Sequence, residues 1–207
     1  VMKHILFKTS FPAEFHAQTA VEAAFKLYPE VKDKWDQIEK IEIDTHESAV
    51  RIIDKKGPLN NPADRDHCLQ YMVAIALLKG NLKAEDYEAE SAADPKIDKL
   101  REKMVVREHL PFSKDYLDPD KRSIANKLTV TLKGKTLSHT QEYPLGHRRR
   151  RKDCIPELFK KYEHNIRSHP LLNRQTSELL KLFYDRKKIE KLPVTELMAL
   201  FTPIGEI

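Results

Sequence analysis

Residues 124–143 read IANKLTVTLKGKTLSHTQEY, and this stretch decides the fold class. Leu128, Val130 and Leu132 alternate with polar residues, which is the two-residue period of a strand that buries one face. A second run of the same kind follows Lys-Gly-Lys at 133–135, a short connection whose glycine suits a tight turn between antiparallel strands. The stretch therefore predicts a β-hairpin.

Helical spacing dominates the sequence before the hairpin. Apolar residues recur every three or four positions from 16 to 27, and Pro29 is expected to end that helix. The most apolar helix is expected to begin at 63–66 and to end near Gly80, because glycine readily adopts the left-handed conformation at a helix C-terminus.

Short strands are predicted between these helices. Ile41 and Ile43 follow strand alternation, and a second strand is expected at 104–108. Residues 45–48 offer polar capping groups, so a short helix that carries Arg51 is expected to begin there. Two more helices complete this part of the chain, at 83–90 and 95–103.

The composition changes after the hairpin. From 153 to 201 the pattern predicts three helical segments and no strand, with breaks near Pro170 and Pro193. We therefore predict an α+β fold in two parts, an α+β domain with a small sheet over 1–146 and a helical segment over 147–207. The second part is too short to bury a large core alone, so we expect it to pack on a domain that this chain lacks.

The bulk composition excludes several classes of protein. Hydrophobic residues make up 40% and charged residues 33%, a balance typical of globular proteins. No run approaches the roughly 20 apolar residues that a membrane-spanning helix needs, so no membrane partner is expected. Two cysteines without a CxxC pair, Cys68 and Cys154, argue against a disulfide scaffold or a metal site and favour a reducing compartment.

The net charge of +5 raises the question of nucleic-acid binding. Basic residues are spread among 32 acidic ones, and only His-Arg-Arg-Arg-Arg-Lys at 147–152 concentrates the charge. No aromatic residue interleaves that run, whereas single-stranded nucleic acid is bound by stacking on aromatic side chains. We expect no nucleic-acid partner, and a basic RNA-binding module is the alternative from another class. The positive excess suits an anionic small molecule equally well.

The sequence begins at Val1 rather than at a methionine, without a basic-then-apolar leader. We therefore expect the chain to be a fragment, with any targeting peptide of the parent outside it. A lysine-rich chain with a pI of about 9.0 suits the mitochondrial matrix if the source is eukaryotic. A bacterial source would instead imply the cytoplasm.

Three stretches carry a resemblance to a known family. They are FKTSFPAEFH at 7–16, RIIDKKGP at 51–58 with NPADRDHC at 61–68, and YPLGHRRR at 143–150. In that order and at that spacing they resemble the C-terminal portion of the MmgE/PrpD family, in its 2-methylcitrate dehydratase branch. The likeness covers essentially the whole chain. Other branches, including cis-aconitate decarboxylase, carry looser forms of these motifs.

The resemblance implies a fold and a reaction. In the family, a large all-helical domain is built from the N-terminal half plus the final helices, and a smaller α+β lid is inserted between them above the active-site cleft. Residues 1–146 would be the lid, and 147–207 would be helices that pack on the missing N-terminal helical domain. The implied reaction is cofactor-free removal of water from 2-methylcitrate in propionate breakdown, by a homodimer. This chain alone is expected to be inactive, because the remaining catalytic residues would lie in the missing domain. Decarboxylation of cis-aconitate is the alternative within the family.

That reaction sets chemical demands on the site. A proton must leave a carbon beside a carboxylate while a tertiary hydroxyl is expelled, which calls for acid–base groups and stabilisation of the developing negative charge. A tricarboxylate substrate also calls for several fixed cations, preferably arginines. The iron–sulfur cluster that aconitase uses needs three cysteines, more than this sequence has.

Lys8, His16 and His67 are the predicted catalytic residues. The resemblance places a lysine just before the Phe-Pro break and a histidine just after it in the active site, although in the decarboxylase branch Glu14 lies nearer the place of that histidine. His67 opens the apolar helix beside Asp66, where a carboxylate can tune an imidazole. The alternatives are a solvated strand end for Lys8 and helix caps for the two histidines.

Arg51, Lys56, His147 and Arg148 are predicted to bind the substrate carboxylates. The segment that carries Arg51 and Lys56 lines the cleft in relatives, and His147 and Arg148 fall where the two domains should meet. The alternatives are a solvated loop around Lys56 and a solvated hinge at 147–152.

Overall fold

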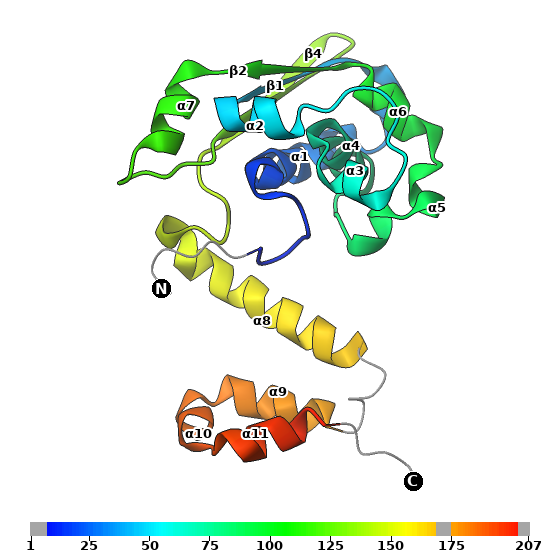
Figure 1. Cartoon of the computed structure of the whole chain (residues 1–207). Helices are drawn as coiled ribbons and strands as arrows, with labels where there is room; N and C mark the ends of the chain where they lie inside the picture. The colour runs from blue at the N-terminus through cyan, green and yellow to red at the C-terminus, as the bar shows by residue number, and fades with distance from the viewer. Residues whose placement is uncertain (1–7, 169–174, 203–207) are drawn as a thin grey trace. The chain divides into compact units, whose positions relative to one another are not determined.

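The computed structural model describes residues 8–168 and 175–202. The chain divides into two compact units, Val1–Arg151 and Lys152–Ile207, each of which is described by itself (Figure 1). The first unit combines a sheet with helices and the described part of the second is helical, so the predicted α+β fold class is confirmed.

The first unit contains a mixed four-stranded sheet in the order β2-β1-β3-β4. Its strands are β1 (Ile38–Thr45), β2 (Met104–Glu108), β3 (Asn126–Leu132) and β4 (Lys135–Gln141). The central strand β1 runs parallel to β2 and antiparallel to β3, and β3 and β4 form the predicted hairpin. Its two-residue loop contains Gly134 with φ +75°, the left-handed conformation that a tight hairpin turn requires.

Helices account for most of the remaining described residues of this unit. In chain order they are η1 (Phe15–Ala17), α1 (Gln18–Val31), η2 (Trp35–Gln37), α2 (Glu47–Ile53), α3 (Pro62–Asp66), α4 (Leu69–Lys79), η3 (Ala84–Tyr87), α5 (Ala89–Ala92), α6 (Pro95–Arg101), α7 (Leu110–Leu117) and η4 (Arg148–Arg150), where η marks a 3-10 helix. Helices α1 and α4 lie on the same side of the sheet in Figure 1. Helix α1 packs against α4, β3 and β4.

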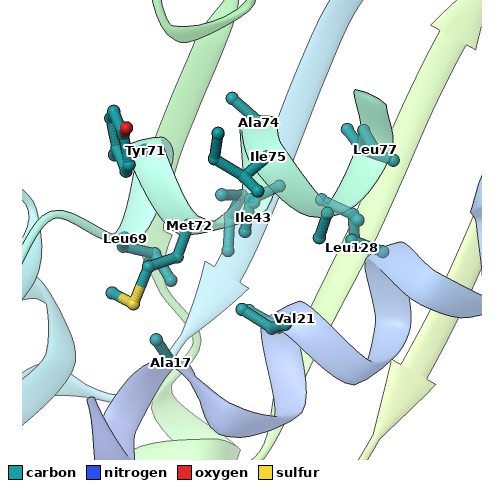
Figure 2. Packing of buried hydrophobic residues seen from close by; sticks show 14 of the residues in the cluster. Ala17, Val21, Ile43, Leu69, Tyr71, Met72, Ala74, Ile75, Leu77 and Leu128 are labelled. Atoms are coloured by element: carbon teal, nitrogen blue, oxygen red, sulfur yellow. The ribbon is translucent and has the colours of Figure 1, made fainter. Parts of the chain in front are cut away.

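The core of the first unit is centred on α4. Every residue from 69 to 77 is buried, as expected of a helix that is apolar all round. Figure 2 shows Met72 and Ile75 of α4 in one cluster with Val21 of α1 and the strand residues Ile43 and Leu128. The inward-facing residues of β1 and β3 are fully buried while their neighbours are partly exposed, so the hairpin alternation reflects one covered face.

Two predicted helix boundaries were wrong. Pro29 does not end the first helix, because α1 continues to the buried Val31 and the Lys32 N–H donates to the Tyr28 carbonyl at 2.9 Å. The helix predicted from 63 to Gly80 is two helices, α3 and α4, because Cys68 between them has extended backbone with φ −119° and ψ 107°. Gly80 does end α4, with φ +69°.

Further differences concern short elements. The helix predicted at 83–90 is divided into η3 and α5, and α7 was not predicted at all. The strand at 104–108 is confirmed, and α6 begins with Pro95 as its first residue. The predicted strand end before Lys8 lies outside the described residues.

The described residues of the second unit form helices joined by short turns. Among residues 151–168 and 175–202 there are four helices rather than the predicted three: α8 (Arg151–Ser168), α9 (Thr176–Tyr184), α10 (Arg186–Lys191) and α11 (Val194–Leu200). The break at Pro193 is confirmed, and Pro170 lies outside the described residues. Two fully packed residues, Ile166 and Leu179, form the centre of a small core. Among residues 8–168 and 175–202, no helix combines the length and the apolarity that crossing a bilayer requires.

Candidate functional site

His16 is held by a carboxylate at the turn that leads into α1. Its Nδ1–H donates to Glu14 Oε1 at 2.8 Å, and its backbone N–H donates to Glu14 Oε2, also at 2.8 Å. Glu14 therefore caps η1 and orients the imidazole at the same time. With Nδ1 as donor, Nε2 is left to accept a proton.

The second nitrogen of this imidazole faces a tyrosine. Tyr116 of α7 places its Oη 3.3 Å from His16 Nε2. Glu14, His16 and Tyr116 thus form a continuous chain of carboxylate, imidazole and phenol. The His16 side chain is 15% exposed, so the imidazole in the middle of these three linked groups is largely shielded from solvent.

A second imidazole lies against this chain. His46, at the junction of β1 and α2, is fully buried, and its ring stacks on that of Tyr116 with centroids 4.5 Å apart. The rings of His46 and His16 are 5.2 Å apart. Burial lowers the pKa of His46 from 6.5 to about 4, with the charge of His16 acting in the same direction, so His46 is neutral at pH 7. We call Glu14, His16, His46 and Tyr116 the histidine cluster.

The sheet and α1 fix the position of the cluster. Asn126, the buried first residue of β3, donates from Nδ2 to the His16 carbonyl at 2.9 Å and to Thr19 Oγ1 at 2.7 Å. Thr19 in turn donates to the carbonyl of Ile124. Because buried amides and hydroxyls with matched partners are rigid, the start of β3 ties η1 to the end of the sheet where His46 lies.

The charge of Glu14 is set by its neighbours. Burial raises the pKa of Glu14, but the hydrogen bond and the positive charge of His16 outweigh burial and hold that pKa below its usual value. The charge of His67 acts in the same direction, so His67 lies within electrostatic range of Glu14. A carboxylate that stays ionised can support a positive charge on the imidazole of His16.

The structure brings the three predicted catalytic residues to one region. Lys8 is exposed, with Nζ 5.3 Å from the ring of Phe15 beside His16. His67 follows α3 with its side chain 51% exposed and its Nδ1 bonded to the carboxylate of Asp66, as the sequence suggested. Lys8 and His67 are therefore the accessible groups, and His16 is the shielded one.

Arg51 and Lys56 are placed differently. Arg51 on α2 has a side chain that is 71% exposed, with Nε 3.7 Å from Glu47 Oε1. Lys56 lines a cavity of about 400 Å³ with Arg101 and Met104. Met104 pairs with Ile41, at the far end of the β1–β2 ladder from His46, and a strand rises about 3.3 Å per residue. Lys56 and the histidine cluster therefore lie at opposite ends of that ladder.

His147 and Arg148 make contacts within the first unit. His147 is buried, its ring is 4.6 Å from that of Tyr143, and its Nδ1 accepts the Arg149 N–H at 3.2 Å. Burial and then the charge of Arg148 lower the pKa of His147. Arg148 donates to the carbonyls of Pro119 and Asp120.

The neighbouring arginines also bond internally. Arg150 forms an ion pair with the half-buried Glu22 of α1 at 2.6 Å and donates to the Tyr143 carbonyl at 2.6 Å. Arg149 lies over the Tyr143 ring and donates to its hydroxyl at 2.7 Å. The arginine run therefore ties residues 143–150 to α1 and to the loop at 119–120, and the structure does not bring it to the histidine cluster.

Sequence reasoning missed two members of the cluster. His46 stands in the 45–48 segment, which was read only as a helix start, and Tyr116 stands on the unpredicted α7. Apart from their types, neither residue carries a local signal, because their proximity to His16 arises from the fold. Within the described residues, no group of three or more His, Cys, Asp or Glu side chains is arranged to hold a metal ion, and both cysteines are free and buried.

The sequence also matches a known protein family. The model of the MmgE/PrpD C-terminal domain matches residues 11–182. The chain therefore belongs to the MmgE/PrpD family.

Several curated relatives are named 2-methylcitrate dehydratase. The chain is 54% identical over 172 residues to "2-methylcitrate dehydratase, mitochondrial" of Yarrowia lipolytica, covering 81% of this chain and 33% of the relative. It is 52% identical over 207 residues to 2-methylcitrate dehydratase of Escherichia coli strain K12, covering 97% of this chain and 42% of the relative. The Salmonella typhi enzyme of the same name is also 52% identical, with the same coverage. The chain thus spans less than half the length of these relatives.

Proposed function

We propose that this chain is the lid and closing helices of a 2-methylcitrate dehydratase. The enzyme would remove water from 2-methylcitrate to give 2-methyl-cis-aconitate, in the methylcitrate cycle of propionate catabolism. The observation that carries the proposal is 52% identity across 97% of the chain to an enzyme of that name. The histidine cluster supports it, because dehydration needs a group that protonates the departing hydroxyl.

We assign a role to each side chain according to how exposed it is. His16, oriented by Glu14, holds the proton that is needed at the leaving oxygen. Lys8 and His67 lie on the accessible side, where cations would neutralise carboxylates of the tricarboxylate substrate and the charge that develops as the carbon proton leaves. Arg51, whose side chain is 71% exposed on α2, is proposed to join them in binding the carboxylates.

Lys56, His147 and Arg148 support substrate binding less directly. Lys56 lines a separate cavity, and His147 and Arg148 are occupied by contacts within the unit. The internal bonds of Arg148, Arg149 and Arg150 also disfavour an RNA-binding role for this run.

The proposed partner of the chain is the N-terminal helical domain that the relatives possess. Exposed apolar residues of the second unit, Ile155, Leu158, Tyr184, Val194 and Met198, would be covered by it. The assembled enzyme is proposed to be a homodimer that needs no cofactor. A eukaryotic source would place it in the mitochondrial matrix, in line with the name of the Yarrowia relative, and a bacterial source in the cytoplasm.

A chimeric enzyme tests the function. The segment of the Escherichia coli relative that precedes the matched region is fused to this chain, and 2-methylcitrate turnover is followed by ultraviolet absorbance of the unsaturated product. The chimera is expected to turn over, whereas this chain alone and the added segment alone are expected to show none. Turnover by this chain alone at the rate of the chimera contradicts the divided site.

The same chimera separates the reaction types. A folded chimera that ignores 2-methylcitrate but releases carbon dioxide from cis-aconitate would show the decarboxylase alternative to be correct. A folded chimera that acts on neither substrate would contradict both assignments.

A further inference from the structure

Both ring nitrogens of His16 are occupied by protein groups. Nδ1 donates to Glu14 at 2.8 Å and Nε2 faces Tyr116 Oη at 3.3 Å. An imidazole with both nitrogens engaged has no free atom for a substrate. Tyr116, the last of these three linked groups, is partly exposed on α7, as His16 and Glu14 also are.

We propose that Tyr116 is a further catalytic residue, whose hydroxyl exchanges a proton with the substrate while His16, held by Glu14, exchanges that proton with Tyr116. The proposal rests on the proposed function and deepens it, because it names the group at which the proton reaches the substrate.

A comparison with other tyrosines of the first unit supports this role. The buried Tyr71 donates its hydroxyl proton to the Asp86 carbonyl at 2.6 Å, and Tyr87 donates to the Pro12 carbonyl at 2.9 Å. These hydroxyls satisfy backbone acceptors, as core tyrosines commonly do. The hydroxyl of Tyr116 is instead paired with an imidazole that a carboxylate orients, which is the arrangement that activates a hydroxyl in acid–base chemistry.

The two imidazoles near Tyr116 have different surroundings. Two imidazoles lie near Tyr116, but His46 is fully buried and stacked flat on the phenol ring, with its pKa lowered to about 4. His16 has the ionised Glu14 beside it and His46 has no carboxylate partner among the described residues. His16 therefore offers Tyr116 a nitrogen on a ring that a carboxylate orients, and His46 serves as a neutral surface for the phenol.

Dehydration breaks a carbon–oxygen bond and a carbon–hydrogen bond of the substrate. The bond between the substrate carbon and its hydroxyl breaks, with the electron pair leaving on oxygen, and that oxygen takes the proton of Tyr116 Oη to leave as water. Tyr116 takes the proton from Nε2 of protonated His16, which becomes neutral. The proton on the neighbouring carbon goes to a separate amine or carboxylate base of the cleft, and its electron pair forms the new double bond.

The test uses Tyr116→Phe, which keeps the ring stacked on His46 and removes the hydroxyl. In the 207-residue chain, histidine ¹⁵N spectra should show a proton on Nδ1 of His16 and a hydrogen bond at its Nε2. The variant should shift the Nε2 resonance of His16, because the hydrogen bond to the phenol is lost. In the chimera, kcat should fall about 100-fold or more with KM changed less than about threefold, as for loss of a general acid.

Tyr143→Phe is the matched control. The Tyr143 ring also lies against a buried histidine, with its centroid 4.6 Å from that of His147, but its hydroxyl accepts from Arg149. This variant should leave the His16 spectrum and kcat at the values of the unsubstituted protein. A Tyr116→Phe spectrum identical to the parent would overturn the proposal.

The activity of the chimera is the second measurement that tests the proposal. An active chimera whose kcat does not change with Tyr116→Phe reduces Tyr116 to a packing residue and overturns this proposal alone. An unsubstituted chimera that folds and shows no dehydration overturns the proposed function, and this proposal with it.

Discussion

Burial decides the charge of His46 at the residue scale. The imidazole is fully buried against Tyr116, and its pKa falls from 6.5 to about 4. Nothing in the polar segment around it, Thr-His-Glu-Ser, distinguishes it from a solvated helix cap. Its neutrality follows from the residues that cover it in the folded chain.

His46 should make stability depend on pH. Its folded-state pKa lies below its unfolded value, so protons bind preferentially to the unfolded chain. Its contribution is complete above about pH 6.5 and is lost as the pH falls toward 4, by on the order of 3 kcal/mol at pH 4. Urea unfolding at pH 7 and pH 4.5 is the measurement, and His46→Phe should flatten the difference between the two.

His139→Phe serves as the control for this prediction. His139 is a partly buried histidine on β4, opposite Leu128, and it has no contact with the cluster among the described interactions. This variant should retain the loss of stability between pH 7 and pH 4.5. If His46→Phe retains the full loss as well, the assignment of that loss to His46 is wrong.

Two glycines show how tertiary packing changes the cost of one local conformation at the element scale. Gly80 at the end of α4 and Gly134 in the hairpin both have positive φ, +69° and +75°. A Cβ at position 80 would lie 2.5 Å from ring atoms of Tyr28 on α1, whereas one at 134 would meet nothing within 4 Å. Both positions therefore require a positive φ, but only position 80 lacks the space for a Cβ atom.

Alanine substitutions should separate these two effects. Gly134→Ala should lower the free energy of unfolding by about 1 kcal/mol, the cost of the left-handed conformation alone. Gly80→Ala should lower it by about 3 kcal/mol, because the methyl group also forces the Tyr28 ring to move. Urea unfolding measures both, and equal losses would show that α1 yields freely at Tyr28.

Local patterns predicted the elements that bury one face or end on a special residue. The hairpin, the strand at 104–108 and the end of α4 at Gly80 follow from alternation and from glycine, which are readable within a few positions. The prediction that Pro29 ends the first helix was wrong, because burial of Val31 favours two more helical residues after the proline. Helix α7 was missed because its residues keep no clear apolar face, and Leu110 and Leu117 are largely exposed.

The two units differ in the size of their cores at the scale of the whole molecule. The first has a continuous core that extends over α1, α4, α6 and the sheet, while the described residues of the second form a cluster of Ile166 and Leu179 with three partly buried neighbours. A core of that size contributes too little to offset the loss of chain entropy. The size of the buried apolar core therefore distinguishes the two units.

Expressing each unit alone should reveal this difference. Residues 1–151 are expected to unfold cooperatively in urea, and residues 152–207 are expected to show low helicity and no cooperative transition by circular dichroism. Adding the N-terminal segment of a relative should raise the helicity of the second unit if that segment is its partner. A cooperative transition for 152–207 alone would show that its small core suffices.

The sequence by itself determined the α+β class, the hairpin, the helical nature of the second part and the likeness to the MmgE/PrpD family, because each rests on local periodicity or on contiguous motifs. It also singled out His16 and His67, which the fold brings near Glu14. Only the tertiary structure joined His16 to Tyr116, a residue 100 positions away, and stacked both against a neutral His46. It likewise directed Arg150 to Glu22, 128 positions distant, and Lys56 to a separate cavity. Contacts between distant segments depend on how the whole chain packs, and no local pattern carries that information.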